Sequence, residues 1–585
     1  MAIENLITDH LDLWTSAVRP KSSAGRGSNS KLELTGIKML RELILELAVR
    51  GKLVPQDPSD EPASVLLTRI AAEKARLVKE GKIRKSKAFP EISEEDKPFD
   101  FPKGWGVLRL GNAINVLNGR AYKKHEMLDS GTPLLRVGNL FTSDKWYYSD
   151  LELEPEKYID NGDLIYSWSA SFGPFIWSGG RVIYHYHIWK MDIFDDISLD
   201  KNFMRLYLDA VSASIKASGN GIAMVHMTKE RMEQLAIPIP PVAEQHRIVT
   251  KVDELTALCD QLEHQSETQL AAHQMLVETL LSTLIDCADA DADADADELA
   301  QNWARLSTHF DTLFTTDASI DALKQTILQL AVMGKLVPQD PSDEPASALL
   351  EHIAAEKARL VKEKKIKKEK PLSAISEDEK PFELPLGWVW SRICESSLFC
   401  EYGSSEKTVS ELSDGIPVLK MGDIQEGKVV LGCHQVVSSK IEDLPDLYLK
   451  QGDILYNRTN SSELVGKTGM FDGDDDKYTF ASYLIRIRCS INNVRPEYLT
   501  LCMNSPLFRK TQIEPHIKQQ CGQANVNGTL MKSMLVSIPP YNEQVLILQK
   551  VNELMTLCDQ LKSRLQISQQ TRLALAESLV EGALA

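Results

Sequence analysis

Four residues near the C-terminus come closest to a catalytic signature. Ile538–Tyr541 reads Ile-Pro-Pro-Tyr, which is similar to the Asp/Asn-Pro-Pro-Tyr/Phe motif of enzymes that methylate exocyclic amino groups. In that motif the Asp or Asn side chain accepts hydrogen bonds from the amine, and the side chain of Ile538 has no acceptor. The related segment Ile239–Val242 reads Ile-Pro-Pro-Val and also lacks the stacking aromatic residue. Neither segment is therefore expected to carry out this chemistry.

Other catalytic and metal-binding signatures are incomplete or missing. Gly466-Lys467-Thr468 matches the end of a phosphate-binding loop, but Ser461 stands where the first glycine of that loop is required. The sequence contains no His-Glu-x-x-His or Gly-x-Ser-x-Gly motif, and its nine cysteines form no Cys-x-x-Cys pair. We therefore expect no catalytic residue, no metal site and no cofactor bound by this chain.

The remaining candidates are polar and aromatic residues suited to recognition, which lie in turns of two long segments. Arg and Lys match the acceptor edge of guanine, Asn and Gln match adenine, and all four can contact phosphates. Ordinary solvated loop residues are the alternative interpretation for each of them. The candidates for contacting nucleic acid in the first segment are Arg120, Tyr122, Lys123, Lys124, Arg136, Asn139, Trp168, Ser169 and Asn220. Those in the second segment are Ser405, Lys407, Lys420, Asp423, Arg458, Asn460, Gln523 and Asn525.

Two basic stretches precede these segments and are placed to neutralise phosphates beside them. The candidate phosphate-contacting residues are Lys82, Arg84, Lys85, Lys87, Lys364, Lys365, Lys367 and Lys368.

Both sets of candidates belong to an internally duplicated chain. Residues 40–105 and 323–388 match without a gap at an offset of 283 positions, and GKLVPQDPSDEPAS is identical in the two copies. A second repeated block occupies residues 239–262 and 538–561, at an offset of 299. The sequences between the two blocks of each half resemble each other only faintly. A shared frame with two different inserts indicates one architecture that reads two different targets.

The repeated frame is predicted to be helical. Apolar residues recur at helical spacing near residues 40–53, where Gly51 suits the C-terminal cap, and a second helix is expected from about residue 63 to 80. Long helices follow the second block, because apolar residues there step by three and four, as in a coiled coil. The predicted seams are Ile248, Val252, Leu255, Cys259, Leu262, Leu276 and Leu280, and Ile547, Val551, Leu554, Cys558, Leu561, Leu565, Leu575 and Leu579.

The inserts contain short aromatic or β-branched runs with frequent Gly and Asn, followed by one helical pattern. We therefore predict an α+β protein with two mixed α/β domains joined by long helices. The expected parts are an N-terminal helical repeat segment (1–105), the first insert domain (106–236), a central long helix (237–285), an acidic Ala-Asp linker with the start of the second repeat (286–322), the second helical repeat segment (323–388), the second insert domain (389–536) and a C-terminal long helix (537–585).

The net charge of −17 does not exclude a nucleic-acid partner. Residues 237–322 hold 3 Lys and Arg against 17 Asp and Glu, which leaves only −3 for the rest of the chain. Salt limits the reach of exposed charges to about 10 Å, so an acidic segment need not repel an anion bound elsewhere. The chain has no apolar run of about 18 residues and no basic-then-apolar start. We expect a cytoplasmic protein without a membrane span.

These features together resemble the specificity (S) subunit of type I restriction-modification systems, most closely the type IB subfamily. The resemblance rests on the two repeated blocks, the Pro-Phe…Pro-x-Gly-Trp ends at Trp105 and Trp388, and the Gly-Asp-Ile/Leu runs of the inserts, and it covers essentially the whole chain. It implies that each insert is a target recognition domain that reads one half of a split DNA sequence. It also implies an antiparallel coiled coil of the repeated helices, with pseudo-two-fold symmetry, that sets the gap between the halves.

The same resemblance implies the partners. They are double-stranded DNA, two methylation (M) subunits and restriction (R) subunits, and the partner subunits would use S-adenosylmethionine, ATP and Mg²⁺ for adenine-N6 methylation and DNA cleavage. This chain would be non-catalytic, and the methylation subunit would flip the adenine out of the duplex. Two alternatives stay open. One is an enzyme that acts alone, which the missing motifs oppose, and the other is a coiled-coil scaffold that presents two protein-binding domains.

Overall fold

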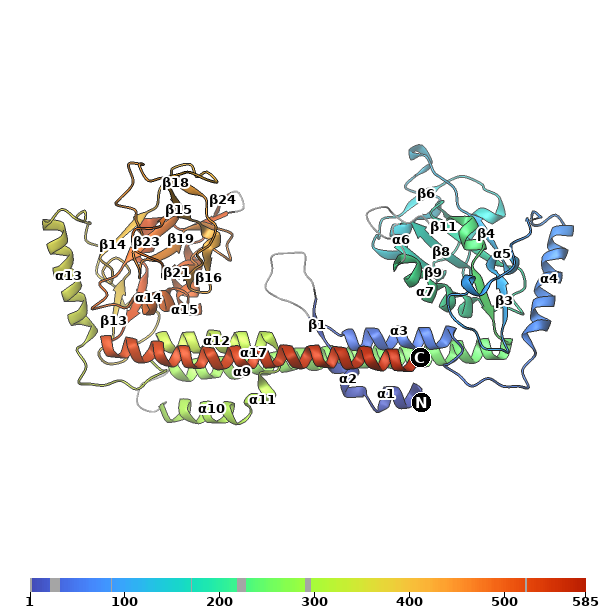
Figure 1. Ribbon diagram of the computed structural model, residues 1–585, viewed down its shortest axis with the longest axis horizontal. Coiled ribbons are helices and arrows are strands. Elements are labelled where there is room, and N and C mark those ends of the chain that lie inside the picture. The colour runs from blue at the N-terminus through green and yellow to red at the C-terminus, as the bar shows by residue number, and fades with distance from the viewer. Residues whose placement is uncertain are drawn as a thin grey trace. The chain divides into compact units, whose positions relative to one another are not determined.

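The computed structural model describes residues 3–21, 32–85, 87–169, 171–217, 228–289, 296–520 and 523–584. The chain forms two compact units, one of residues up to 268 together with 568–585, and one of residues 269–567 (Figure 1). Two long helices, α9 (Val242–Asp289) and α17 (Tyr541–Leu584), therefore contribute to both units. Each unit combines helices of the repeated frame, one mixed α/β domain and one part of each long helix.

The repeated frame is helical in both units, as predicted. Gly51 follows the first frame helix with a φ of +66°, and Gly334 occupies the same place in the second copy with a φ of +72°. Glycine reaches this left-handed conformation without steric cost, so each helix ends where the sequence indicates. The first unit contains α1 (Ile3–Thr8), α2 (Leu11–Ser16), α3 (Thr35–Val49) and α4 (Ala63–Lys79), with the short strands β1 (Arg19–Pro20) and β2 (Leu32–Glu33). The second contains α10 (Ala296–Thr308), α11 (Phe310–Leu313), α12 (Asp317–Val332) and α13 (Ala346–Lys362).

The first α/β domain is built on two four-stranded sheets, in the orders β6-β5-β10-β7 and β4-β11-β8-β9, and a two-stranded ladder of β3 and β12. The ladder joins the start of the domain to its end, because β12 leads directly into α9. The strands are β3 (Gly106–Arg109), β4 (Ile114–Asn118), β5 (Thr132–Leu135), β6 (Tyr147–Ser149), β7 (Tyr158–Ile159), β8 (Leu164–Ser169), β9 (Ser171–Ile176), β10 (Val182–Tyr184), β11 (Ile188–Ile193) and β12 (Ala236–Ile239). The helices are α5 (Leu110–Ala113), α6 (Val137–Phe141), α7 (Lys201–Ala217) and α8 (Lys229–Glu233).

The second domain repeats this plan with a six-stranded sheet β14-β23-β19-β21-β17-β16, two three-stranded sheets β18-β15-β22 and β20-β25-β24, and the ladder β13-β26. Its strands are β13 (Val389–Arg392), β14 (Phe399–Tyr402), β15 (Gly415–Leu419), β16 (Ile424–Gln425), β17 (Lys428–Val429), β18 (Val436–Ser438), β19 (Ile454–Asn457), β20 (Thr459–Asn460), β21 (Thr468–Met470), β22 (Thr479–Phe480), β23 (Leu484–Arg488), β24 (Lys518–Gln520), β25 (Gln523–Asn525) and β26 (Leu535–Ile538). Its helices are α14 (Pro496–Met503), α15 (Pro506–Phe508) and α16 (Gly528–Ser533).

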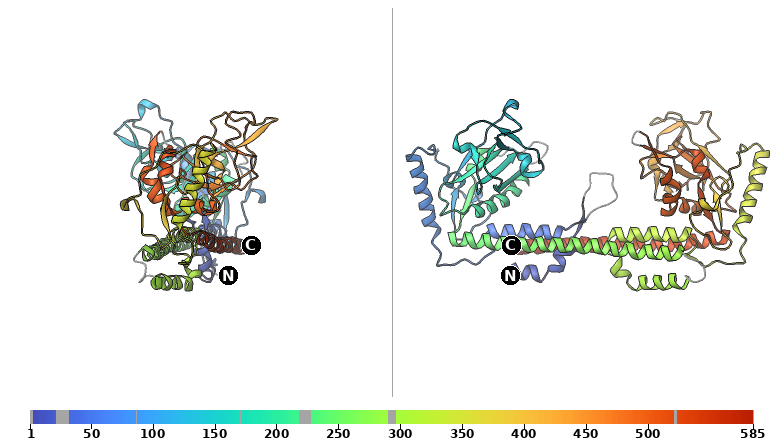
Figure 2. Two further views of the ribbon diagram at one scale, coloured as in Figure 1. Left: turned by 90° about the vertical axis from the view of Figure 1, so that its left-hand side faces the viewer. Right: turned by 180° about the vertical axis from the view of Figure 1, so that it is seen from behind.

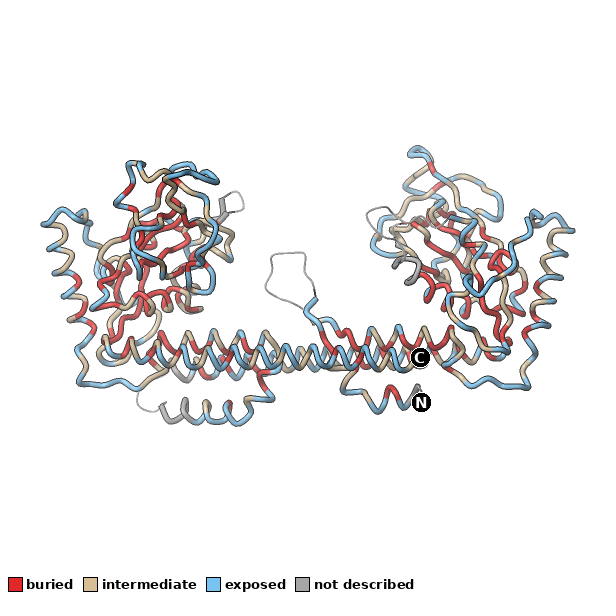
Figure 3. The backbone as a smooth tube through the Cα atoms, viewed as in Figure 1, coloured by how far each residue is buried: buried red, intermediate tan, exposed pale blue. Residues whose placement is uncertain are grey.

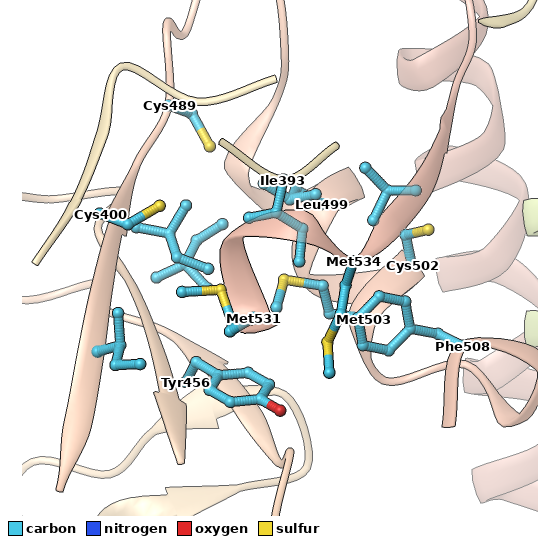
Figure 4. Packing of buried hydrophobic residues seen from close by; sticks show 14 of the residues in the cluster. Ile393, Cys400, Tyr456, Cys489, Leu499, Cys502, Met503, Phe508, Met531 and Met534 are labelled. Carbon is cyan, nitrogen blue, oxygen red and sulfur yellow. The ribbon is translucent and has the colours of Figure 1, made fainter. Parts of the chain in front are cut away.

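The core of the second domain lies between its helices and the six-stranded sheet. Met531 of α16 and Met503 of α14 pack between Tyr456 of β19 and Phe508 of α15 (Figure 4). Methionine fills irregular gaps well because its side chain is unbranched. This packing fixes the ends of β19 and β25, which carry several of the candidate recognition residues.

The Gly-Asp-Ile/Leu runs have the same structural role in both domains. Asp163 accepts a hydrogen bond from the backbone N–H of Asp160 at 2.8 Å and forms an ion pair with Lys190 at 2.6 Å. Asp453 accepts from the N–H of Lys450 at 2.8 Å and pairs with Arg488 at 2.5 Å. The aspartate thus closes the turn before a central strand and binds the neighbouring strand, so this repeated motif maintains the fold.

One joint fastens each domain to its long helix. The indole N–H of Trp105 donates to the buried Glu244 carboxylate at 3.0 Å, and that of Trp388 donates to Glu543 at 2.9 Å. The next residue of each helix is a buried glutamine whose side chain bonds only to backbone groups of the domain. Gln245 bonds to Asp200 N, Ser198 O and Pro240 O, and Gln544 bonds to Arg495 N, Asn493 O and Pro539 O. The repeated Glu-Gln pair and the Gly-Trp ends therefore belong to one structural contact.

Within the second unit, the frame helix α12 runs antiparallel to α17. Lys324 pairs with Asp559 at 2.5 Å and Asp321 pairs with Lys562 at 2.9 Å, so residue numbers rise along one helix as they fall along the other. The two helices lie side by side in both views (Figures 1 and 2). The end of α9 completes this bundle, because Val277 and Leu281 share one apolar cluster with Val551.

The predicted seam is confirmed in the first part of α9, where Ile248 to Leu262 are buried at every predicted position. It is wrong further along, because Leu276 is 51% exposed and Val277 is buried instead. The same shift occurs in α17, where Leu575 is 53% exposed and Ala576 is buried. The buried side of each helix depends on its neighbours, and these change where the helix leaves one unit for the other (Figure 3).

The Ala-Asp tract is only partly described. α9 extends to Asp289 and α10 begins at Ala296, so both ends of the tract are helical. The predicted linker between them lies outside the described residues.

Candidate nucleic-acid interface

Three segments of the first domain converge on one turn. The turn His185–His187 connects β10 to β11 and thereby passes from one four-stranded sheet to the other. Arg120, which follows β4, donates its backbone N–H to Tyr184 O and accepts from Tyr186 N, both at 3.1 Å. At the end of β8, Trp168 donates its backbone N–H to His187 O at 3.2 Å. The turn therefore brings together candidates that lie up to 48 positions apart in the sequence.

Gly119 is required for this approach. A Cβ atom at Gly119 would lie 2.4 Å from the carbonyl oxygen of His185. Gly403 has the same role in the second domain, where its Cβ would lie 2.2 Å from the carbonyl oxygen of Phe480. Such distances exclude any side chain, so both glycines are structural.

The second domain repeats the same set of backbone hydrogen bonds. Ser404 donates its N–H to Phe480 O and accepts from Ser482 N, both at 2.9 Å. Arg458 donates its backbone N–H to Tyr483 O at 3.2 Å, as Trp168 does to His187. The predicted correspondence of the segments 118–124 and 402–407, and of 168–171 and 458–461, is therefore observed in the fold.

Aromatic and cationic side chains gather around the turn of the first domain. The ring of Trp168 lies 6.3 Å from that of Tyr186 and 5.2 Å from that of His187, and its indole N–H donates to Tyr186 O at 2.9 Å. The guanidinium of Arg120 is 5.2 Å from the Tyr122 ring and pairs with Glu126 at 2.7 Å. Flat rings beside cations are suited to stacking with bases and to contact with phosphates.

The turn histidine is held neutral. Partial burial, followed by the neighbouring His187 and Arg136, lowers the pKa of His185 to about 4. An uncharged imidazole presents one donor and one acceptor. At neutral pH His185 is therefore a hydrogen-bonding group rather than a cation.

Different side chains occupy the equivalent site of the second domain. The guanidinium of Arg458 lies 5.1 Å from the ring of Tyr402, whose hydroxyl accepts from Gly528 N at 2.6 Å. Strands β20 and β25 pair Asn460 with Ala524, and Thr459 donates to the side chain of Asn525 at 3.0 Å. Segments that are about 65 positions apart in the sequence thus form one surface.

Several candidates have structural roles in the fold. Asn139 accepts from Arg136 N at 3.2 Å, and Asp423 accepts from Lys420 N at 2.7 Å, so both close the same turn after β5 and β15. Ser169 is buried. Tyr122 is also buried, and burial raises its pKa to about 12.

The other candidates present side chains outside these cores or lie beyond the description. Lys123, Lys124, Ser405 and Lys407 are exposed. Arg136 is half-buried over Tyr147, and Lys420 is held by Thr408 and Gln435. Asn220 lies outside the described residues, and Gln523 lies in β25 with its side chain outside the description.

All eight candidate phosphate-contacting residues are exposed. The stretches follow α4 and α13, which are anchored to the domains through Lys74 bonded to Gly111 O at 2.8 Å and Lys357 bonded to Cys394 O at 2.6 Å. Lys82 pairs with Glu80 at 3.0 Å and Lys365 with Glu363 at 2.9 Å. Exposed pairs of this kind are weak, so these lysines can exchange a carboxylate for a phosphate.

Sequence reasoning missed the turn His185–His187 and its counterpart Ala481–Tyr483. The run Tyr-His-Tyr-His at Tyr184–His187 is an unusual concentration of rings and was a usable signal. The counterpart Ala-Ser-Tyr has no local signal.

Within the described ranges, no group of three His, Cys, Asp or Glu residues is placed to hold a metal ion. Across the same residues, no helix combines the length and apolar character needed to cross a bilayer.

A duplicated frame that presents two divergent domains, each with a polar and aromatic site on the same backbone scaffold, defines a two-site recognition protein. The family description "Type I restriction modification DNA specificity domain" matches residues 102–272 and 399–569. This chain belongs to that family of type I restriction-modification specificity subunits.

Full-length relatives agree with this assignment. The chain is 41% identical to the type I restriction enzyme EcoEI specificity subunit of Escherichia coli over 605 residues and 42% identical to the EcoAI specificity subunit over 611, with 100% of each chain covered. These relatives accord with the type IB resemblance. Among solved structures, the HsdS subunit of Thermoanaerobacter tengcongensis is 14% identical with a TM-score of 0.37, over 83% of this chain and 98% of that one.

Proposed function

We propose that each domain contacts one half of a bipartite DNA target through the turn site and the exposed basic residues around it. The observation that carries this proposal is the identical backbone scaffold in two domains whose side chains differ. Specificity requires contacts to base edges, and a common scaffold with different side chains reads two sequences in the same manner. Arg120, Arg136 and Trp168 are the central candidates in the first domain, and Lys420 and Arg458 in the second.

The other candidates divide into two groups. The exposed residues Lys123, Lys124, Ser405 and Lys407, with the two basic stretches, contact phosphates and hold the duplex in register. Asn139, Asp423 and Tyr122 act indirectly, because they maintain the turns that carry Arg136, Lys420 and Arg120.

The long helices set the spacing between the half-sites and dock two methylation subunits. The unpredicted exposure of Leu276 and Leu575 supports two equivalent docking surfaces, because these leucines occupy matching positions of the repeat and one lies in each unit. Exposed apolar residues at related positions are suited to binding two copies of one partner. The methylation subunits then modify adenine with S-adenosylmethionine, and restriction subunits cleave DNA with ATP and Mg²⁺, in the cytoplasm. This chain contributes recognition only.

The test is to map methylated adenines across the genome of cells that express the methylation subunit with and without this chain. We expect a motif of two short sequences separated by a fixed gap, present only when both proteins are expressed. A contiguous motif, or the same motif without this chain, would contradict the proposal. If the purified complex retains no duplex specifically, the chain is a protein scaffold instead.

A further inference from the structure

We propose that the turn His185–His187 of the first domain and its equivalent Ala481–Tyr483 of the second are specificity-determining elements that select the bases each domain accepts. This inference rests on the proposed function and deepens it, because it assigns a role to residues that no motif in the sequence indicates.

The two turns are equivalent by hydrogen bonding. Each turn donates the N–H of its first residue to the end of a neighbouring strand, His185 to Leu135 O at 2.9 Å and Ala481 to Leu419 O at 3.0 Å. The carbonyl of that residue accepts from the residue three positions later, Ile188 N and Leu484 N, both at 2.9 Å. With the bonds to Arg120 and Ser404 described above, this superimposes the two turns residue by residue without reference to sequence similarity.

The residues around the turns keep their character while the turns do not. Tyr184 and Phe480 before the turns are both buried rings, and Ile188 and Leu484 after them are both buried aliphatic residues. Between them, His-Tyr-His corresponds to Ala-Ser-Tyr, which differ in size, aromaticity and hydrogen-bonding groups at each position. Side chains that only maintained a shared fold would be expected to resemble each other, as the flanking residues do.

The neighbours of the turns change with them. Arg136 faces His185 closely enough to contribute to its low pKa, and the equivalent residue beside Ala481 is Lys420. Trp168, which contacts Tyr186 and His187, is replaced by Arg458 beside Tyr483. Base-reading sites differ in this correlated manner, because a donor or acceptor must be matched by the groups that position it.

The exposed positions of the first turn offer defined chemistry. Tyr186 is 40% exposed, and neutral His185 offers one donor and one acceptor. The major-groove edge of adenine also presents one acceptor and one donor, whereas guanine presents two acceptors. Neutral imidazole and hydroxyl groups therefore complement adenine better than guanine, while the nearby arginines complement guanine.

The experiment uses the intact complex of this chain with its methylation subunits. The triple variant H185A/Y186S/H187Y places the second turn on the first scaffold, and A481H/S482Y/Y483H makes the reciprocal exchange. We expect each variant to change or relax one or two base pairs in a single half of the methylated motif, with the other half and the gap unchanged. I197S is the matched control, because Ile197 is an apolar residue of the first domain that is 70% exposed and distant from the turn in the sequence.

The outcomes separate this inference from the proposed function. If the wild-type complex methylates a bipartite motif and all assembled turn variants keep that motif unchanged, the turns do not determine specificity and the proposed function stands. If the wild-type complex shows no bipartite motif, the proposed function itself fails. Should the triple variants not assemble, Y186S decides, since its exposed side chain can be removed with little effect on packing. An unchanged motif in Y186S, with rates equal to I197S, would then overturn the inference.

Discussion

Replacing Glu244 should weaken the joint between the first domain and α9 by a defined amount. The Glu244 carboxylate is buried and accepts the indole N–H of Trp105 at 3.0 Å. Glu244→Ala leaves this buried donor without a partner, which costs about 1–3 kcal/mol. For a domain of this size, about 2–4 °C of unfolding temperature corresponds to each kcal/mol, so the first transition should fall by roughly 2–12 °C.

Glu244→Gln is the matched control, because its amide oxygen can still accept from Trp105. Burial raises the pKa of Glu244 above its ordinary value. A raised acid pKa gives stability that is present below the unfolded pKa and lost as pH rises through the folded pKa. The glutamine does not titrate, so the difference in unfolding temperature between E244Q and the wild type should shift in favour of E244Q as pH rises from about 4 to about 7.

The assay is differential scanning calorimetry combined with hydrogen exchange of residues 242–250. We expect faster exchange in this segment for E244A and not for E244Q, with the segment that follows Trp388 unchanged. Glu543→Ala should produce the mirror-image result in the second unit, because Trp388 donates to Glu543 at 2.9 Å. If E244A and E244Q unfold at the same temperature, the indole bond does not hold the joint and the reasoning is refuted.

Two further predictions concern affinity and spacing. Replacing the second basic stretch with glutamine should weaken specific and non-specific duplexes alike and flatten the log-log dependence of binding on salt by up to about 0.9 for each phosphate that is no longer neutralised; weaker binding at only one half-site, in salt titrations by fluorescence anisotropy, would show that these lysines read bases. The substituted residues are Lys364, Lys365, Lys367 and Lys368. Inserting four residues after Gln265 adds about 6 Å and roughly 40° of helix, so the preferred gap should change by one or two base pairs, and an assembled variant that keeps its gap on a spacer series of duplexes would exclude the helices as the determinant of spacing.

The sequence predicts the frame well because its signals are local or repeated. Gly51 and Gly334 mark helix ends, and the repeated Glu-Gln pair marks the start of each long helix. The seam beyond Leu262 could not be predicted, because the side of a helix that becomes buried depends on neighbours distant in the sequence. Leu276 satisfies the heptad spacing and is nevertheless exposed.

The recognition sites were predictable as paired turns but not as a set of contacting residues. Asn139 and Asn460 have the same chemical groups, and only the fold shows that Asn139 closes a turn while Asn460 lies on a strand edge. The turn His185–His187 meets Arg120 through long-range strand pairing, which leaves no pattern in the local sequence. Sequence reasoning therefore finds the segments that recognise a ligand more reliably than the side chains.

The central claim is that the two domains read separate halves of one target independently. The most direct measurement is to exchange residues 106–236 for the corresponding segment of a relative with a different target, and to map the adenines methylated by the assembled complex. We predict a motif in which one half matches the donor of the segment, while the other half and the gap match the original. A motif altered in both halves, or in neither, would contradict the account.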